Sequence, residues 1–118
     1  MKTLAAIFAY NEGEKIRRTI TRHPYPRDYD LLVMDDGSTD GAIESLPKNG
    51  WLHLRNPTNQ GVGAAMKHVF DYAIENNYDV LVVQAGNDKD DPNEIPRLLD
   101  PIRSGRADFC LLYTSRCV

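Results

Sequence analysis

Acidic side chains follow two apolar runs of this sequence, at points where a buried strand would end. Residues 31–34 are all apolar, and a polar turn that begins with Asp35 and Asp36 follows them at once. Residues 4–9 are also apolar and lead into Tyr10, Asn11 and Glu12. Carboxylates accept hydrogen bonds from a base N–H or from ribose hydroxyls, and a tyrosine ring offers a flat face to a base. These residue types predict a ligand site of nucleotide character.

The elements that would position these side chains alternate between strand and helix. Strands are expected over residues 4–9, 31–34, 51–55, 80–83 and 107–112. Helices are expected over residues 12–22, from 39 or 40 to about 46, over 62–74, and between Pro92 and Gly105. This alternation predicts an α/β fold with a mostly parallel sheet and helices on both faces. Both acid-tipped strands would then end at the same edge of the sheet, where open α/β sheets bind ligands.

The helix over residues 62–74 has the clearest apolar pattern in the chain. Its apolar residues recur at steps of three and four, and we expect them to form one buried face: Val62, Ala65, Met66, Val69, Phe70, Ala73 and Ile74.

Composition narrows the classes of function. The chain has 118 residues, enough for one domain, and its 14 Lys and Arg against 17 Asp and Glu give a net charge of −3. This balance gives no basic surface for nucleic acid. The apolar runs are far shorter than the ~20 residues of a spanning helix, and the N-terminal residues do not resemble a signal peptide. A cytoplasmic protein is therefore expected.

A glycine-containing loop precedes the helix over residues 62–74. In Asn59-Gln60-Gly61-Val62-Gly63, Gly61 and Gly63 could let backbone N–H groups approach a phosphate at the start of a helix. The alternative is a loop whose glycines supply positive φ and bind nothing.

A third polar cluster follows the strand over residues 80–83. It contains Asn87, Asp88 and Asp90, and carboxylate oxygens together with diphosphate oxygens suit Mg²⁺ or Mn²⁺. The alternative is a polar loop in which Asp91 caps the next helix.

Three segments in this order resemble the motifs of family 2 glycosyltransferases, in the subgroup of dolichyl-phosphate mannose synthases and related polyprenyl-phosphate sugar transferases. They are Phe8-Ala9-Tyr10-Asn11-Glu12, Val33-Met34-Asp35-Asp36-Gly37-Ser38-Thr39-Asp40, and Asn59-Gln60-Gly61-Val62-Gly63-Ala64-Ala65. The resemblance extends from about residue 3 to residue 108.

The resemblance implies a Rossmann-like GT-A fold that binds a UDP- or GDP-linked sugar at the carboxyl ends of the strands. It implies inverting transfer to a polyprenyl phosphate or a saccharide, and peripheral association with the cytoplasmic face of a membrane. The positions that match nucleotide-sugar-binding residues of the family are Ala9, Tyr10, Glu12, Asp36, Gly61, Gly63, Asn87 and Lys89. No catalytic residue can be carried over, because the family's acceptor base is expected beyond the end of this chain.

The chain departs from the family pattern before the Tyr-Asn-Glu run and in the metal motif. The usual proline before the run is absent, and the Asp-Ala-Asp-Gly-Gln motif aligns with Ala85-Gly86-Asn87-Asp88-Lys89. A weakened Mg²⁺ or Mn²⁺ site at Asn87 and Asp88, or one shifted to Asp88 and Asp90, is one expectation. The other is that the Lys89 ammonium does part of the electrostatic work of the cation.

The last nine residues also depart from the family. We expect residues 1–109 to be the donor-binding half of the glycosyltransferase domain and residues 110–118 to be an atypical tail similar to translated sequencing-adapter read-through. Such a fragment is expected to be inactive by itself. Two alternative functions remain: a non-catalytic nucleotide-binding module, and a nucleotidyltransferase of related fold. Against the latter, no Gly-rich basic loop follows the first strand.

Overall fold

The computed structural model describes residues 2–89, 91–103, 110–111 and 116–117. Its centre is a four-stranded sheet in the order β3-β2-β1-β4, in which every neighbouring pair is parallel. The strands are β1 (Thr3–Ala9), β2 (Asp30–Asp35), β3 (Leu52–Arg55) and β4 (Val80–Ala85). The predicted parallel α/β sheet is confirmed.

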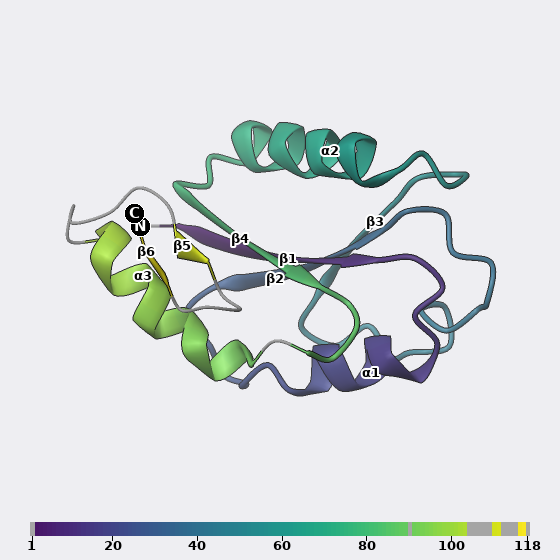
Figure 1. Cartoon of the computed structure of the whole chain (residues 1–118), viewed down its shortest axis with the longest axis horizontal. Coiled ribbons are helices and arrows are strands. Elements are labelled where there is room, and N and C mark those ends of the chain that lie inside the picture. Colours follow the sequence, from purple (N-terminus) through teal and green to yellow (C-terminus); the bar gives the residue numbers. More distant parts are fainter. Residues whose placement is uncertain (1, 90, 104–109, 112–115, 118) are drawn as a thin grey trace.

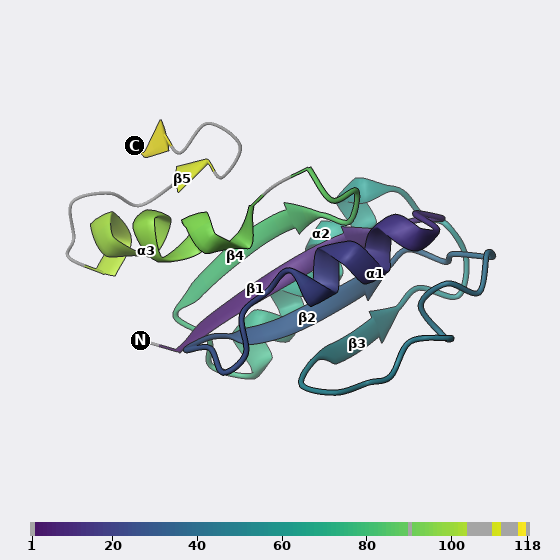
Figure 2. The ribbon, with the colours of Figure 1, turned by 90° about the horizontal axis from the view of Figure 1, so that it is seen from below.

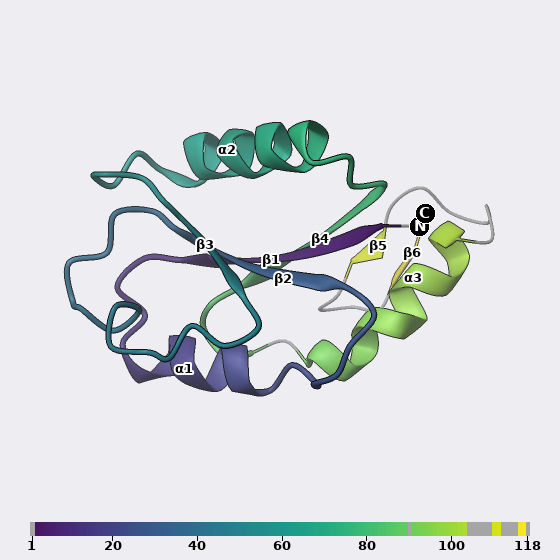
Figure 3. The same ribbon diagram turned by 180° about the vertical axis from the view of Figure 1, so that it is seen from behind.

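Helices cover both faces of this sheet, as Figure 1 and the reverse view in Figure 3 show. Helix α2 (Val62–Glu75) lies on one face, and α1 (Glu14–Thr21) and α3 (Ile95–Arg103) lie on the other. A 3₁₀ turn, η1 (Pro92–Glu94), leads into α3, and Asp91 caps it by accepting a hydrogen bond from the Asn93 N–H (3.0 Å). Figure 2 shows α1 over β1 and β2 and α3 beside β4.

The alternation of side chains along the central strands builds two hydrophobic cores. Successive residues of a strand point to opposite faces. Ala5 and Ile7 of β1 therefore pack with Ile16 of α1, while Leu4 and Ala6 pack under α2. Both faces of β1 and β2 are buried, and their sequences are continuous apolar runs for this reason.

The predicted buried face of α2 is only partly correct. Ala65, Val69 and Ala73 are buried, as expected, and follow one another at steps of four. Val62, Phe70 and Ile74 are instead exposed, at 72%, 48% and 75% of their surface. The apolar stripe is wider than the face that the sheet can cover, so its second row lies along the side of the helix.

Two other expectations require correction. Residues 42–45 form turns instead of a helix: the Ser45 N–H bonds to the Gly41 carbonyl and the Leu46 N–H to the Ile43 carbonyl, but these bonds do not repeat with the regular spacing of an α-helix. The expected strand over residues 107–112 is described only at β5 (Cys110–Leu111), which pairs antiparallel with β6 (Arg116–Cys117) in a separate two-stranded sheet. The other residues of that expected strand, 107–109 and 112, lie outside the described residues.

Candidate functional site

A cavity lies where β1 and β2 end and α2 begins. β1 and β2 pair with Ala9 opposite Asp35, and the N–H of Asp36 donates to the carbonyl of Ala9 (2.9 Å). The cavity has a volume of about 240 Å³ and is lined by Phe8, Ala9, Tyr10, Glu12, Asp36, Asn59, Gly61, Val62 and Ala65. The structure therefore brings together five of the residues that the sequence singled out: Ala9, Tyr10, Glu12, Asp36 and Gly61.

Asp36 is buried and accepts three hydrogen bonds from the segment before α2. Its Oδ1 accepts from Asn56 Nδ2 (2.9 Å) and from the N–H of Gln60 (3.0 Å), and its Oδ2 accepts from the N–H of Gly61 (2.9 Å). Burial alone would raise the pKa of Asp36, but these hydrogen bonds outweigh burial and hold the pKa below its ordinary value. The ionised carboxylate thus joins the end of β2 to the start of α2.

A histidine of α2 supports this carboxylate through Asn56. His68 Nδ1 lies 3.1 Å from Asn56 Oδ1, so the hydrogen bond requires the proton on Nδ1. With Oδ1 fixed in this way, the amide nitrogen of Asn56 faces Asp36. Sequence reasoning did not single out His68 or Asn56, because neither belongs to a motif with a chemical signature.

The two adjacent aspartates have different surroundings. Asp35 is fully buried and accepts from the N–H of Ser38 (2.8 Å) and from Arg55 Nη1 (2.8 Å). Arg55 Nη2 also donates to the carbonyl of Ser38 (3.0 Å). Asp35 therefore holds the turn after β2 in shape, whereas Asp36 lines the cavity.

The β1–α1 loop is bonded to that same turn. Asn11 has a left-handed backbone (φ 49°), its N–H donates to Ser38 Oγ (3.0 Å), and its Oδ1 accepts from the N–H of Thr39 (2.8 Å). The N–H of Gly13 donates to Asp40 Oδ2 (3.0 Å). These contacts fix the backbone on either side of Glu12, and the Tyr10 ring remains 45% exposed.

The two glycines before α2 have different surroundings. Gly61 has a positive φ of 94° at the N-cap, which agrees with the alternative reading of this loop, and its N–H is already donated to Asp36. Gly63 lies inside the first turn of α2, where backbone N–H groups have no partner within the helix. Phosphate binding at this helix start remains a prediction.

The loop after β4 lies against the end of β1. The N–H of Gly86 donates to the carbonyl of Phe8 (2.8 Å), and a Cβ on Gly86 would lie 3.0 Å from that carbonyl oxygen and 3.4 Å from Ala9 Cβ. The absence of a side chain at Gly86 permits this approach. Asn87 and Lys89 therefore follow at the same edge of the sheet, although neither lines the cavity. Asp90 lies outside the described residues.

Asp88 does not fit the predicted role of a cation ligand. Its carboxylate accepts from Arg18 Nε (3.2 Å) and Arg22 Nη1 (3.0 Å), and the hydrogen bond from Arg22 is the main cause that lowers its pKa. Among the described residues, no group of three or more His, Cys, Asp or Glu side chains could hold a metal ion. The divalent cation remains a prediction, and no described residue is assigned to it.

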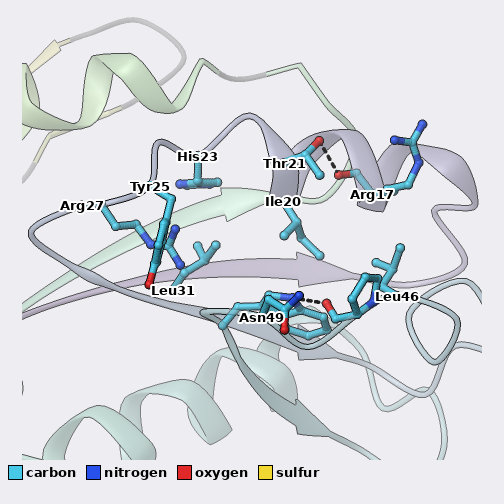
Figure 4. Close-up of a pocket in the computed structure, with 11 residues that line it drawn as sticks. Arg17, Ile20, Thr21, His23, Tyr25, Arg27, Leu31, Leu46 and Asn49 are labelled. Carbon is cyan, nitrogen blue, oxygen red and sulfur yellow. Dashed lines mark hydrogen bonds between the residues drawn. The ribbon is translucent and has the colours of Figure 1, made fainter.

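A larger cavity of about 390 Å³ lies on the α1 face of the sheet (Figure 4). Its walls are mostly apolar and include Leu31, Leu46 and Trp51, and the Trp51 Nε1 donates to the carbonyl of Pro47 (3.0 Å). His23, also in the wall, has Tyr29 Oη and Gln84 Oε1 at 2.7 Å and 2.8 Å from its ring nitrogens. Burial lowers the pKa of His23 to about 4. The histidine is thus neutral at pH 7 with both nitrogens bonded within the protein, which is typical of a structural role.

The sequence matches the glycosyl transferase family 2 over residues 5–116. It is 34% identical over 110 residues to an undecaprenyl-phosphate mannosyltransferase of Micrococcus luteus, covering 88% of this chain and 45% of that protein. It is 36% identical over 118 residues to a polyprenol monophosphomannose synthase of Mycolicibacterium smegmatis, covering 93% and 44%. The chain thus spans less than half the length of these relatives.

Solved structures agree on the fold. The crystal structure of residues 1–349 of TarS from S. aureus superposes with a TM-score of 0.68 at 17% identity, covering 92% of this chain and 34% of that one. No helix in the described part of the chain is long and apolar enough to cross a membrane. With three ordered motifs around one cavity and a family match over nearly its whole length, the chain belongs to glycosyl transferase family 2 and has the Rossmann-like GT-A fold of that family.

Proposed function

We propose that this chain binds the donor of a glycosyltransferase that moves a sugar from a nucleotide diphosphate to a polyprenyl phosphate. The main observation that supports this proposal is the cavity at the carboxyl edge of the sheet, where Tyr10, Glu12 and Asp36 lie together beside the start of α2. A polyprenyl phosphate acceptor is supported by the two relatives described above, because their names include undecaprenyl phosphate and polyprenol. A saccharide acceptor is the alternative.

The chemistry of the cavity suits a nucleoside at this edge. The exposed ring of Tyr10 offers a stacking face, and the carboxylates of Glu12 and Asp36 accept hydrogen bonds from base N–H groups or ribose hydroxyls. Asp36 Oδ2 accepts one hydrogen bond within the protein, so it retains acceptor capacity toward the cavity. The diphosphate would then extend toward the start of α2, with Gly61 and Gly63, and toward Asn87 and Lys89.

The proposed reaction is an inverting displacement. An oxygen of the acceptor phosphate attacks the anomeric carbon, the bond from that carbon to the donor diphosphate breaks, and the nucleoside diphosphate leaves with the electron pair. A polyprenyl phosphate is already ionised, so the attack requires no general base from the protein. The resemblance to the family implies that Mg²⁺ or Mn²⁺ stabilises the charge of the leaving diphosphate, but no group of side chains among the described residues fits such a cation. We further propose that the full-length enzyme associates peripherally with the cytoplasmic face of a membrane and that it does not bind nucleic acid.

Calorimetric titration of the purified chain with UDP, GDP and their sugar conjugates tests this proposal. We expect the chain to bind either UDP and its sugar conjugates or GDP and its sugar conjugates, and we expect the Asp36→Ala variant to lose this binding. The matched control is Asp71→Ala, because Asp71 lies on the exposed side of α2 and pairs only with Lys67 (3.0 Å) among the described residues. Equal binding of wild type and Asp36→Ala would contradict the assignment of the cavity.

A transfer assay with labelled sugar nucleotides and polyprenyl phosphate then separates an enzyme from a binding module. Transfer above the Asp36→Ala background indicates an enzyme, whereas binding without turnover in the full-length protein would favour a non-catalytic module. Turnover of nucleoside triphosphates would favour the nucleotidyltransferase alternative.

A further inference from the structure

One residue, Asp88, connects the loop after β4 to α1 through hydrogen bonds and ion pairs. Besides the two arginine contacts to its carboxylate, its carbonyl accepts from Arg22 Nη1 (3.1 Å), and its N–H donates to Thr19 Oγ1 (2.9 Å). Helix α1 and its C-cap residue Arg22 therefore bond to the N–H, the carbonyl and both carboxylate oxygens of this residue. Figure 1 shows the chain passing close to α1 directly after β4.

The conformation of Asp88 makes this attachment specific. Its φ is 62°, in the left-handed region, which costs most residues of order 1 kcal/mol but which Asp and Asn tolerate better than most. The residue two positions before it, Gly86, lies against Phe8 and Ala9. Residues 86–88, directly after β4, are thus held at both ends, with Asn87 between the two attachments and Lys89 directly after the second.

The charges around Asp88 disfavour a metal cation at its carboxylate. Arg18, Arg22 and Lys89 contribute three positive charges, and Asp88, Asp90 and Asp91 contribute three negative ones, so the formal charges of this part of the sequence balance. Both carboxylate oxygens of Asp88 face guanidinium groups, and a divalent cation beside them would be repelled by two fixed positive charges. The ammonium of Lys89 would instead attract a diphosphate group.

We propose that Arg18 and Arg22 are positioning residues for the diphosphate of the donor, and that this loop binds the diphosphate without a divalent cation. The arginines act through Asp88, which holds the backbone of Asn87 and Lys89 at the carboxyl edge of the sheet, the edge at which the cavity also lies. This inference rests on the proposed function, because it assumes that a nucleoside diphosphate occupies that cavity.

The test compares the affinities for nucleoside diphosphates and monophosphates. UDP, GDP, UMP and GMP are titrated into the 118-residue chain by calorimetry, once with EDTA and once with Mn²⁺. The variants are Arg18→Gln, Arg22→Gln and Asp88→Asn, and Asn retains the tolerance of the left-handed backbone. The control is Arg17→Gln on the same helix, because Arg17 pairs with Glu14 (2.9 Å) and not with the loop.

We expect diphosphate binding in EDTA and, in each of the three variants, an affinity for diphosphate about fivefold to tenfold lower, with monophosphate affinity within about twofold of wild type. Arg17→Gln should match wild type. The double variant Arg22→Gln/Asp88→Asn should lose no more affinity than either single variant, because the two residues act as a unit. A purely structural role would lower both affinities together, so the ratio between them separates positioning from general destabilisation.

Several results would overturn the inference. Diphosphate binding that needs Mn²⁺ and disappears in Asp88→Asn would make Asp88 a cation ligand. Equal losses for monophosphate and diphosphate, or no loss, would remove the positioning role while leaving the proposed function intact. A wild-type chain that binds neither UDP nor GDP under either condition would refute the proposed function and this inference together. If Arg22→Gln fails to fold, Arg18→Gln and Asp88→Asn measure the same ratio.

Discussion

Replacing Asp36 by Asn separates the contribution of its charge from that of its shape. The amide is nearly isosteric with the carboxylate, but it has one acceptor oxygen in place of two. The structure gives Asp36 three donors, two of them on Oδ1 and one, the N–H of Gly61, on Oδ2. The best orientation of the amide keeps its oxygen toward the pair of donors. The amide nitrogen then faces the Gly61 N–H, so that a donor meets a donor.

The free-energy cost of Asp36→Asn follows from these contacts. One hydrogen bond to a charged acceptor is lost, at about 1.5–3 kcal/mol, and the two that remain become neutral and weaker by up to about 1 kcal/mol each. The amide is easier to bury than the carboxylate, which offsets part of this loss. We expect the free energy of unfolding to fall by about 2–3 kcal/mol. The affinity for the nucleoside diphosphate that binds should fall by about 1–3 kcal/mol.

Urea unfolding measures the first quantity and calorimetry the second. The control is Asp71→Asn, whose exposed pairing with Lys67 should contribute less than about 0.5 kcal/mol to stability and nothing to binding. If Asp36→Asn unfolds within about 0.5 kcal/mol of wild type, the carboxylate does not join β2 to α2 as argued. If stability falls but binding does not, Asp36 is structural and the nucleoside lies elsewhere.

Three further outcomes can be measured. The pKa of His23 is lowered from 6.5 to about 4, so the stability that its neutral form gives is complete above pH 6.5 and decreases as the pH falls toward 4. Urea unfolding should show that the free energy of unfolding falls by about 2 kcal/mol between pH 7 and pH 5. A free energy of unfolding that does not change over this range would contradict the burial of His23. Gly37→Ala should lower the free energy of unfolding in urea by about 3 kcal/mol, because the φ of Gly37 is +77° and a Cβ there would overlap the backbone of Thr58. In the control Gly41→Ala, φ is also positive (+71°) but the Cβ would meet open space, so the loss should be only about 1 kcal/mol. The nucleoside diphosphate that binds should stabilise the chain by about 2.7 kcal/mol at one hundred times its Kd, and no rise in melting temperature would contradict a folded donor site.

The sheet was predictable because its central strands β1 and β2 are buried on both faces and β4 also contains a continuous apolar run. Residues 4–9, 31–34 and 80–83 are apolar almost without interruption, and the observed strands β1, β2 and β4 extend these ranges by no more than two residues at either end. The segment at residues 41–46 was not predictable in the same way. Asp40 there bonds both to the N–H of Ala42 and to the distant Gly13, and the second contact depends on the tertiary structure.

The clustering of the site residues was also predictable, but their individual roles were not. Parallel strands place their carboxyl ends together, so Glu12 and Asp36 had to lie near one another once β1 and β2 were neighbours. Sequence alone could not show that Asp35 would be buried against Arg55 while Asp36 would line the cavity. Adjacent residues with the same chemistry are distinguished only by the direction in which the chain turns after β2.

The prediction of a cation at Asp88 remains untested, but it did not take account of the helix that lies beside the loop. Arg18 and Arg22 are four positions apart and so lie on one side of α1, where both reach Asp88. That spacing is visible in the sequence. What is not visible is that the loop after β4 passes across this side of the helix, since the contact joins residues 66 and 70 positions apart.

The loops around the candidate site are bonded to one another by contacts within the protein. Asn11 and Ser38 join the first loop to the second, Asp36 joins the second to the start of α2, and Asp88 joins the loop after β4 to α1. Each connection uses a polar side chain that bonds to backbone groups of another segment. A site whose loops are already ordered loses little conformational entropy when it binds, so more of each contact with the ligand contributes to affinity. The hydrogen bonds that join the loops therefore contribute to binding. Removing those of Asp36 or Asp88 should lower the affinity for a nucleoside diphosphate even where the ligand touches neither carboxylate.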